Sequence, residues 1–272
     1  MNRLFRLTLL VVGAALLAGS ALSQEVAFKD PTGDDNGPGK YVYATDPVYK
    51  PGSFDLTDLK VKVSGDKVEF SVGVNSNLED PWRMGGGFSV QMAFIFVQTG
   101  NWKEGTGFTK GLPGLNVAFA PADAWDRAVV LSPQPPNRVK SEVELKAPSM
   151  KDAVLVPTRT KGSGRTLSGT VSLKELGGGD PTKWGYQVCV QSNEGFPDKT
   201  DLLSRKVNEF EGQHRFGGGN DGDCDPHAID VLAGDAKGDK AEADEQHKML
   251  AYECNPDGTP KAMATLKMIR KK

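Results

Sequence analysis

The sequence predicts an all-β protein, a single β-sandwich of about ten or more strands with little helix. Short apolar segments, several of them alternating with polar residues, recur along the chain and are separated by Gly, Pro and Asn turns. Helical patterns are scarce: only KAEADEQHKMLAYE and a turn at SLKEL suggest helix. Because no internal repeat and no Pro- or Ser-rich linker is visible, residues 24–272 are predicted to form one domain.

The N-terminus, residues 1–23, is typical of a signal peptide. MNRLFR carries two Arg and no acid, and Ala21 and Ser23 occupy the −3 and −1 positions of a cut before Gln24. The apolar run between them has about 13 residues, fewer than the ~20 that a membrane span needs, and no later segment is longer. We therefore expect a secreted chain, extracellular or periplasmic, that does not span a membrane.

The strands are expected in the following order. FDLTDLKVKV and KVEFSVGVN, separated by SGD, predict a hairpin whose second strand points Val68, Phe70, Val72 and Val74 to one face. FSVQMAFIFVQ is apolar on both faces, which predicts a central strand covered on both sides. Further strands are expected at LNVAFA, RAVVLS, VKSEVELK, AVLVPT, RTLSGTVSL and WGYQVCVQS.

The three cysteines would lie in an oxidising compartment. Cys224 and Cys254 lie in the polar, turn-rich segments GDCDPH and YECNPD, whereas Cys189 lies in the apolar YQVCVQ. We predict a Cys224–Cys254 disulfide and a buried Cys189 thiol that packs as a small apolar group.

The charge balance excludes one class of partner. Without Arg3 and Arg6, the chain has 31 Lys and Arg against 35 Asp and Glu, a net charge of −4. There is no basic stripe and no Arg cluster, so no nucleic-acid partner is expected.

The stretch DPTGDDNGPGKYVYATD, residues 30–46, concentrates Asp30, Asp34, Asp35 and Asp46 among turn residues. Clustered carboxylates repel one another unless a cation neutralises them, and Ca²⁺ accepts six to eight oxygen ligands in irregular geometry. The stretch can equally be an Asp-rich turn whose side chains accept hydrogen bonds from backbone amides. Composition alone leaves both interpretations open.

A second acidic loop, GGGNDGDCDPHAID, is a further candidate metal loop. Asp221, Asp223 and Asp225 follow one another at every second position, and Asp230 comes later. The spacing is like the first half of an EF-hand, but the sixth position is Pro and the twelfth is not Glu. The alternative is a solvated turn.

Aromatic residues in polar loops are candidate sugar-binding groups, since a flat ring stacks on the apolar face of a pyranose. Trp82 and Trp102 lie in such loops, and Tyr41 and Tyr43 lie in the first acidic stretch. Trp125 and Trp184 border apolar strands and are expected in the core.

Motifs of catalysis are missing from the sequence. It has no GxSxG, no P-loop, no GxGxxG before a helix and no metal-ligand spacing among its three His. It also lacks the CxxCH motif of c-type haem attachment, so haem is not an expected cofactor. No catalytic residue is predicted.

Several segments, taken in order, resemble the C-terminal module of glucodextranase, which also occurs as a tail on pullulanase-type enzymes. The most specific is DPxGDDxGPGxYxY; the others include EDPWRMGGGFSVQMAFIFV, LPGLNVAF, WGYQVCVQSNEG, HRFGGG and DPHAIDVL. The resemblance implies a β-sandwich similar to DOMON-type and family-nine carbohydrate-binding modules. It also implies a non-catalytic role in carbohydrate binding or cell-surface attachment.

The resemblance favours calcium as a cofactor. Asp30, Asp34 and Asp35 match the motif, and Asp55 and Asp126 match neighbouring motif positions, so these five are the expected ligands. The expected partner is an α-glucan or another cell-surface polysaccharide. Two alternatives stay open: a glycoside hydrolase or accessory subunit acting on α-glucans, and a haem-binding electron carrier of the DOMON type.

Overall fold

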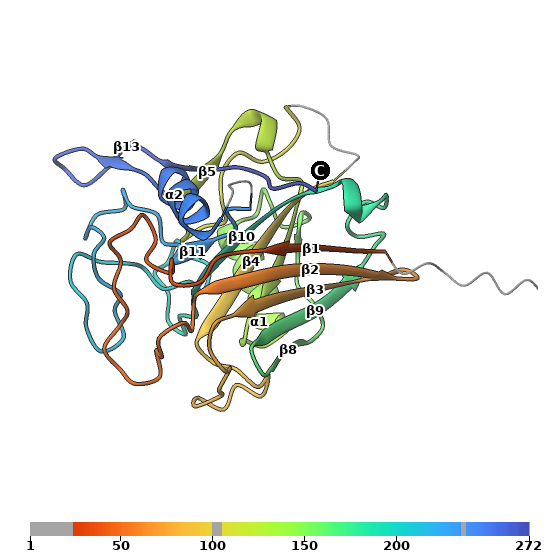
Figure 1. Ribbon diagram of the computed structural model, residues 1–272, viewed down its shortest axis with the longest axis horizontal. Helices are drawn as coiled ribbons and strands as arrows, with labels where there is room; N and C mark the ends of the chain where they lie inside the picture. Colours follow the sequence, from red (N-terminus) through yellow and green to blue (C-terminus); the bar gives the residue numbers. More distant parts are fainter. Residues whose placement is uncertain (1–23, 100–104, 235–237, 272) are drawn as a thin grey trace, which may run out of the picture.

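The computed structural model describes residues 24–99, 105–234 and 238–271. The predicted signal peptide therefore lies outside the described residues. Within them, the chain forms two five-stranded sheets that pack face to face, two short strand pairs and two α-helices (Figure 1). The predicted all-β sandwich with little helix is confirmed.

The first sheet is antiparallel throughout and includes the predicted hairpin. Its strand order is β1-β2-β3-β9-β8: Glu25–Lys29, Leu56–Ser64, Lys67–Val74, Thr166–Ser172 and Thr160–Ser163. Ser64 pairs with Lys67 where β2 turns into β3. Val68, Phe70, Val72 and Val74 are fully buried while Lys67 and Glu69 are exposed, as the alternation predicts.

The second sheet is buried on both faces. Its strand order is β11-β10-β4-β6-β7: Asp230–Val231, Gly185–Ser192, Gln91–Gln98, Arg127–Leu131 and Val154–Leu155. Every residue of β4 and β10 is buried. The prediction of a central strand covered on both sides at FSVQMAFIFVQ is confirmed.

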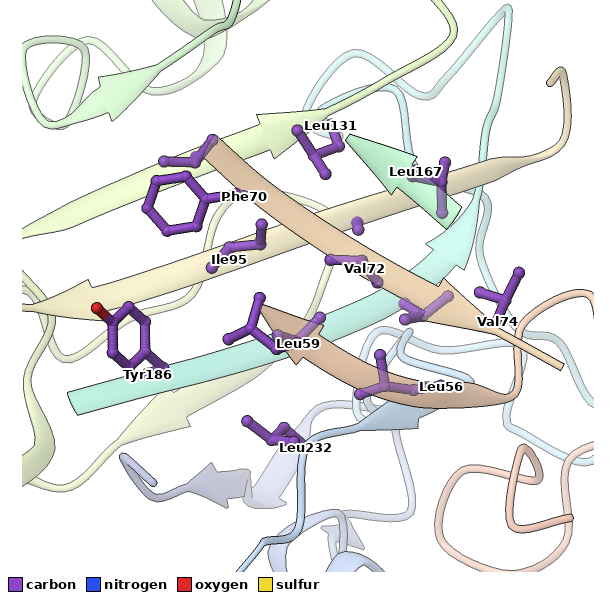
Figure 2. Close-up of a cluster of buried hydrophobic side chains, with 14 of the residues drawn as sticks. Leu56, Leu59, Phe70, Val72, Val74, Ile95, Leu131, Leu167, Tyr186 and Leu232 are labelled. Carbon is purple, nitrogen blue, oxygen red and sulfur yellow. The ribbon is translucent and has the colours of Figure 1, made fainter. Parts of the chain in front are cut away.

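One hydrophobic core fills the space between the two sheets. Phe70 and Val72 of β3 belong to this core together with Ile95 of β4 and Tyr186 of β10 (Figure 2). All four are fully buried. Their burial holds the sheets together, since apolar area removed from water contributes roughly 25 cal/mol per Å².

A second core covers the outer face of the second sheet. Met92, Phe94 and Phe96 of β4 point into it, because alternate residues of a strand face opposite sides. The covering elements are α1 (Pro136–Lys146), the parallel pair β5 (Val117–Phe119) and β14 (Ala264–Leu266), and the end of α2 (Asp239–Met249). The chain is therefore layered on three levels rather than two.

The expected strand at VKSEVELK is wrong, because this segment is helix α1. Pro136 stands at its first turn, where a missing N–H costs nothing. Val139 and Val143 are buried on one helical face, whereas Leu145 is 76% exposed. A spacing of four residues puts Val139 and Val143 on one face of either a helix or a strand. A strand would also bury Leu145 on that face, so its exposure identifies the helical period.

The cysteine prediction is confirmed. Cys224 and Cys254 form a disulfide with a Cα–Cα distance of 5.4 Å, and Cys189 is a buried free thiol. The bridge joins the second acidic loop to the hairpin of β12 (Glu253–Cys254) and β13 (Pro260–Ala262).

Short 3₁₀ helices lie at Pro121–Asp123 and Pro181–Lys183. None of the described helices is long and apolar enough to cross a bilayer.

The two acidic loops meet at one end of the sandwich. Figure 1 shows the orange segment after β1 beside the cyan segments after β10, next to α2. Val42 bridges to Gly217 in antiparallel fashion, and the amide of Thr45 donates to the carbonyl of Gly212. We call this end, formed by residues 30–55 and 193–229, the loop end.

Candidate metal centre

Four aspartates from both sheets converge at the loop end. Asp30 follows β1 and Asp55 precedes β2; because these strands are antiparallel neighbours, both residues lie at the same end of the first sheet. Asp34 lies in the loop after β1, and Asp230 begins β11 of the second sheet. We call Asp30, Asp34, Asp55 and Asp230 the carboxylate cluster.

Backbone amides hold three of these carboxylates by one oxygen each. The bonds are Asp30 Oδ1 from the Ala233 amide (3.0 Å), Asp55 Oδ2 from Gly33 (2.9 Å) and Asp230 Oδ2 from Leu56 (2.7 Å). Gly33 adopts φ +88°, a left-handed conformation that glycine accepts without strain. Asn75 Nδ2 also donates to Asp55 Oδ2, at 3.0 Å. The carboxylates are thus oriented before any ligand arrives.

The remaining oxygens of the cluster have no hydrogen-bond partner among the described residues. They are Asp30 Oδ2, both oxygens of Asp34, Asp55 Oδ1 and Asp230 Oδ1. The four residues are at most 8% exposed, and carboxylate oxygens of Asp30, Asp34 and Asp230 lie within 4.8 Å of one another. In the part of the chain that the structure describes, no Lys, Arg or His pairs with any of them.

The electrostatics of the cluster are unfavourable for a metal-free protein with ionised carboxylates. Burial, together with repulsion from Asp34 and Asp55, raises the pKa of Asp30 well above its usual value. Burial, followed by repulsion from Asp30 and Asp34, does the same to the pKa of Asp230. Burial raises the pKa of Asp34 to about 7 and raises that of Asp55. Either protons or a cation must neutralise this cluster.

The donor set fits a hard divalent cation. It offers carboxylate oxygens only, with no thiolate or imidazole, and such oxygens suit Ca²⁺ and Mg²⁺ rather than Zn²⁺ or copper. Ca²⁺ accepts irregular arrangements and backbone carbonyls, whereas Mg²⁺ demands near-ideal octahedral geometry and retains its water. A loop-derived cluster of this kind therefore favours Ca²⁺.

Of the other two expected ligands, Asp35 lies beside the carboxylate cluster, where its charge repels Asp34 and Asp55, and Asp126 lies elsewhere. Asp35 accepts a hydrogen bond from the Tyr43 hydroxyl. Asp126 accepts from the amide and hydroxyl of Thr99, at 3.1 and 2.7 Å. Thr99 follows β4, whereas Asp230 pairs with Val190 beside the start of β4, so Asp126 stands at the opposite end of the sandwich. The structure does not bring Asp126 to the cluster.

The aspartates of the second acidic loop do not come together in one site. Asp230 joins the carboxylate cluster, and Asp221 accepts from the Glu209 amide. Asp223 pairs with Lys206 at 2.7 Å. Lys206 also reaches Asp198 and Asp201, at 3.1 and 3.7 Å, and we call these four residues the lysine cluster. This loop does not form a metal site of its own in the described chain.

Asp225 has a buried environment apart from both clusters. The Tyr41 hydroxyl donates to the Pro226 carbonyl at 2.7 Å and lies 3.5 Å from Asp225 Oδ2. Burial raises the pKa of Asp225 to about 7, and burial lowers the pKa of the neighbouring His227 to about 4. His227 is therefore neutral at pH 7, and its Nδ1 accepts from the Val207 amide.

The candidate sugar platforms differ in accessibility. Tyr41 is buried by its loop, and Tyr43 packs edge-on against Phe54 and Phe216, so the structure argues against both as platforms. Trp82 is 36% exposed and keeps part of its ring in solvent. Trp102 lies outside the described residues. Trp125 and Trp184 are buried in the core, as expected.

Asp230 does not belong with the second acidic loop, where the sequence pattern groups it. It follows Asp221, Asp223 and Asp225 closely in the chain, but it is the first residue of β11. The apolar run AIDVLA around it is the signal that it begins a buried strand rather than continuing the loop.

Two facing sheets and a carboxylate cluster between their ends define the chain as a β-sandwich module with a candidate metal centre. The family model described as the C-terminal binding-module, SLH-like, of glucodextranase matches residues 26–268. The chain belongs to this family, and the resemblance seen in its sequence motifs is confirmed. No curated protein sequence matches at a significant level.

Proposed function

We propose that the chain is a secreted, non-catalytic carbohydrate-binding or cell-surface-attachment module whose loop end is completed by a calcium ion. The observation that carries the calcium proposal is the set of buried carboxylate oxygens that no described residue satisfies. The family, described as a binding module, supports the attachment role.

Asp30, Asp34, Asp55 and Asp230 would hold the ion. When bound, calcium supplies the positive charge that ionised carboxylates need at neutral pH. Asp30 and Asp55 flank β1 and β2, while Asp230 belongs to the facing sheet, so ligation would tie the two sheets at this end. The role of the metal is therefore structural.

The position of the carboxylates also supports a non-catalytic role. Glycoside hydrolysis uses two carboxyl groups that flank the sugar, roughly 5–10 Å apart, in a cleft that admits substrate. The residues of the carboxylate cluster are buried beneath the loop end, and backbone amides hold three of them. That arrangement suits a structural cation better than proton transfer to a sugar.

Thermal unfolding of residues 24–272 at pH 8, in millimolar calcium and in a chelator, tests the metal. A ligand present at about 100 times its Kd stabilises the folded state by about 2.7 kcal/mol. For a domain of this size, that is a rise in Tm of roughly 5–10 °C. Magnesium at the same concentration should give a smaller rise. An unchanged Tm would reject a structural calcium.

Binding to α-glucans tests the attachment role. Retention of the chain on dextran, pullulan or amylose, without release of reducing sugar, is the expected result. Glucan turnover that one Asp or Glu substitution abolishes would instead establish the hydrolase alternative. A Soret band in protein purified with haem would establish the electron-carrier alternative.

A further inference from the structure

A groove opens at the loop end, beside the lysine cluster. It encloses about 280 Å³ between the segment that follows β10 and the segment that leads to the second acidic loop. Its lining includes Glu194, Phe196, Asp198, Arg205, Lys206 and His214. None of these belongs to the carboxylate cluster, so the groove is a separate feature.

Phe196 is the most exposed large apolar side chain of the described residues, at 95%. Its ring is not on a loose tail, because its amide donates to Glu194 Oε1 at 2.9 Å and Pro197 follows it. A fixed loop that presents a bare aromatic ring at the edge of a groove offers a flat apolar face to a ligand. A single exposed Phe is ordinary on a protein surface, and the charged groove beside it distinguishes Phe196.

The groove around Phe196 is rich in charge, but that charge is internally balanced. Arg205 pairs with Glu194 at 2.7 Å, and Lys206 pairs with Asp198 at 3.1 Å. Three carboxylates and three Lys or Arg side chains line it in all. An anion or a cation would have to break these pairs, whereas a neutral ligand rich in hydroxyl groups can accept from the cations and donate to the carboxylates at once.

The groove wall also keeps unused hydrogen-bonding capacity. Ser204 Oγ and Arg205 Nε line it or lie just behind it and have no hydrogen-bond partner within the described residues. Both atoms are buried, and Ser204 is 2% exposed. Polar atoms without partners are unusual in a folded protein and indicate a missing partner.

A second aromatic group adjoins the groove. The His214 ring, which lines it, contacts the Trp82 ring at 6.4 Å and the Tyr49 ring at 5.8 Å between centroids. The partly exposed Trp82 therefore lies next to the lining and not on a distant face. Trp82, a candidate sugar-binding residue, thus belongs to the surroundings of the groove.

We propose that this groove is the glycan-binding site of the module and takes a neutral saccharide. One pyranose ring stacks on Phe196, and its hydroxyls bond to the Glu194–Arg205 pair and to Asp198. The assignment rests on the proposed carbohydrate-binding function and adds where the sugar sits and that it carries no charge.

Affinity electrophoresis of the calcium-loaded chain in gels containing dextran, pullulan, amylose or polygalacturonate tests this assignment. The chain offers a matched pair of variants. Phe196→Ala removes the ring at the groove, and Phe210→Ala removes a ring that is 63% exposed but does not line it. Because both rings are in solvent, neither change should affect folding, which the Tm of each variant verifies.

We expect binding to a neutral glucan that Phe196→Ala weakens about tenfold, since the substitution removes the aromatic stacking contact. Phe196→Tyr should retain binding, and Phe210→Ala should bind as wild type. If wild type binds a neutral glucan and Phe196→Ala binds equally well, the groove is wrong while the binding function stands. Retention by polygalacturonate alone would refute the neutral ligand. If wild type binds no polymer, the proposed function itself fails.

Discussion

The carboxylate cluster and the lysine cluster solve the same electrostatic problem in different ways. Each gathers at least three aspartates at the loop end. In the lysine cluster the chain supplies the cation. Partial burial lowers the pKa of Lys206, but hydrogen bonds to Asp223 and Asp198 outweigh burial and raise it. In the carboxylate cluster the described residues supply only amide donors, so the charge remains for something outside the chain to neutralise.

Burial explains the difference. Lys206 keeps 27% of its side chain in solvent, where a long cationic chain can stay hydrated while its ammonium group pairs with carboxylates. Asp230 and Asp55 lie beneath the loops and against the core, where a Lys would lose its hydration and side-chain entropy. A small divalent ion brings two positive charges into such a space and, unlike Lys, needs no room for an aliphatic side chain. Two of the three carboxylates that pair with Lys206 are largely exposed, whereas all four residues of the carboxylate cluster are buried.

Asp230→Asn should break the carboxylate cluster with the largest effect. The amide oxygen can still accept from Leu56, but one ligand charge is lost. In millimolar calcium we expect the variant to lose most of the metal contribution, about 3 kcal/mol of unfolding free energy. In chelator it should be as stable as wild type or more stable, because one buried charge has been removed. Thermal unfolding in both buffers gives the two values.

Asp225→Asn is the matched control for this experiment. Asp225 is equally buried and its pKa is raised to about 7, but it stands with Tyr41 and outside the carboxylate cluster. Its variant should keep the full calcium response. A loss of response in both variants would mean that the response does not come from the carboxylate cluster.

The pH dependence sharpens the comparison. The pKa of Asp34 is about 7 in the metal-free fold and about 3.9 in the unfolded chain. Between these values the folded state holds a proton that the unfolded state has released, so metal-free stability falls as pH rises from 5.5 to 8.

The proposed calcium ion would bind the ionised carboxylates, so its contribution to stability should grow over the same pH range. The gain in stability on adding calcium should be about 2 kcal/mol larger at pH 8 than at pH 5.5. Tm measured with and without chelator at each pH checks this expectation. A gain that shrinks as pH rises would contradict carboxylate ligation.

Lys206→Met tests the lysine cluster with a smaller expected effect. Removing one partly exposed cation from three aspartates should cost about 1 kcal/mol. The Tm should fall by roughly 2–4 °C, equally in calcium and in chelator. If calcium restored the lost stability, the ion would be able to replace Lys206 among the three aspartates. The lysine cluster would then also be a cation site.

Asp35→Asn should have the smallest effect on calcium binding, although its neighbour Asp34 is a proposed ligand. Asp35 is bonded to the Tyr43 hydroxyl, whereas both oxygens of Asp34 lack partners in the described chain. We expect the calcium response to persist in Asp35→Asn and to fall sharply in Asp34→Asn. Calcium titration followed by tryptophan fluorescence compares the two, and a reversed order would assign the ligand to Asp35.

Much of the fold was predictable because strand alternation is a local signal. The hairpin of β2 and β3 and the doubly buried β4 follow directly from the apolar pattern. Helix α1 was missed because Val139 and Val143 are four residues apart, a spacing that both periods share. Only tertiary packing, which leaves Leu145 in solvent, distinguishes them.

The candidate site was only partly predictable, because it is assembled across the sandwich. Asp30, Asp34 and Asp55 were identified from a motif and are brought together. Asp230 joins them through the pairing of β11 with β10, a long-range contact that sequence neighbours do not reveal. Asp126 matches a neighbouring motif position, but it accepts a hydrogen bond from Thr99 and therefore lies at the far end of β4.

The unpartnered oxygens of the carboxylate cluster also bear on export. Free calcium is scarce inside cells and abundant outside them, so a sandwich whose end is completed by this ion would gain its last increment of stability only after crossing the membrane. Without the ion, protons would have to neutralise Asp30 and Asp230, because burial and mutual repulsion raise the pKa of both side chains. The stability of this end of the sandwich would then depend on the calcium concentration and the pH of the compartment that holds the chain.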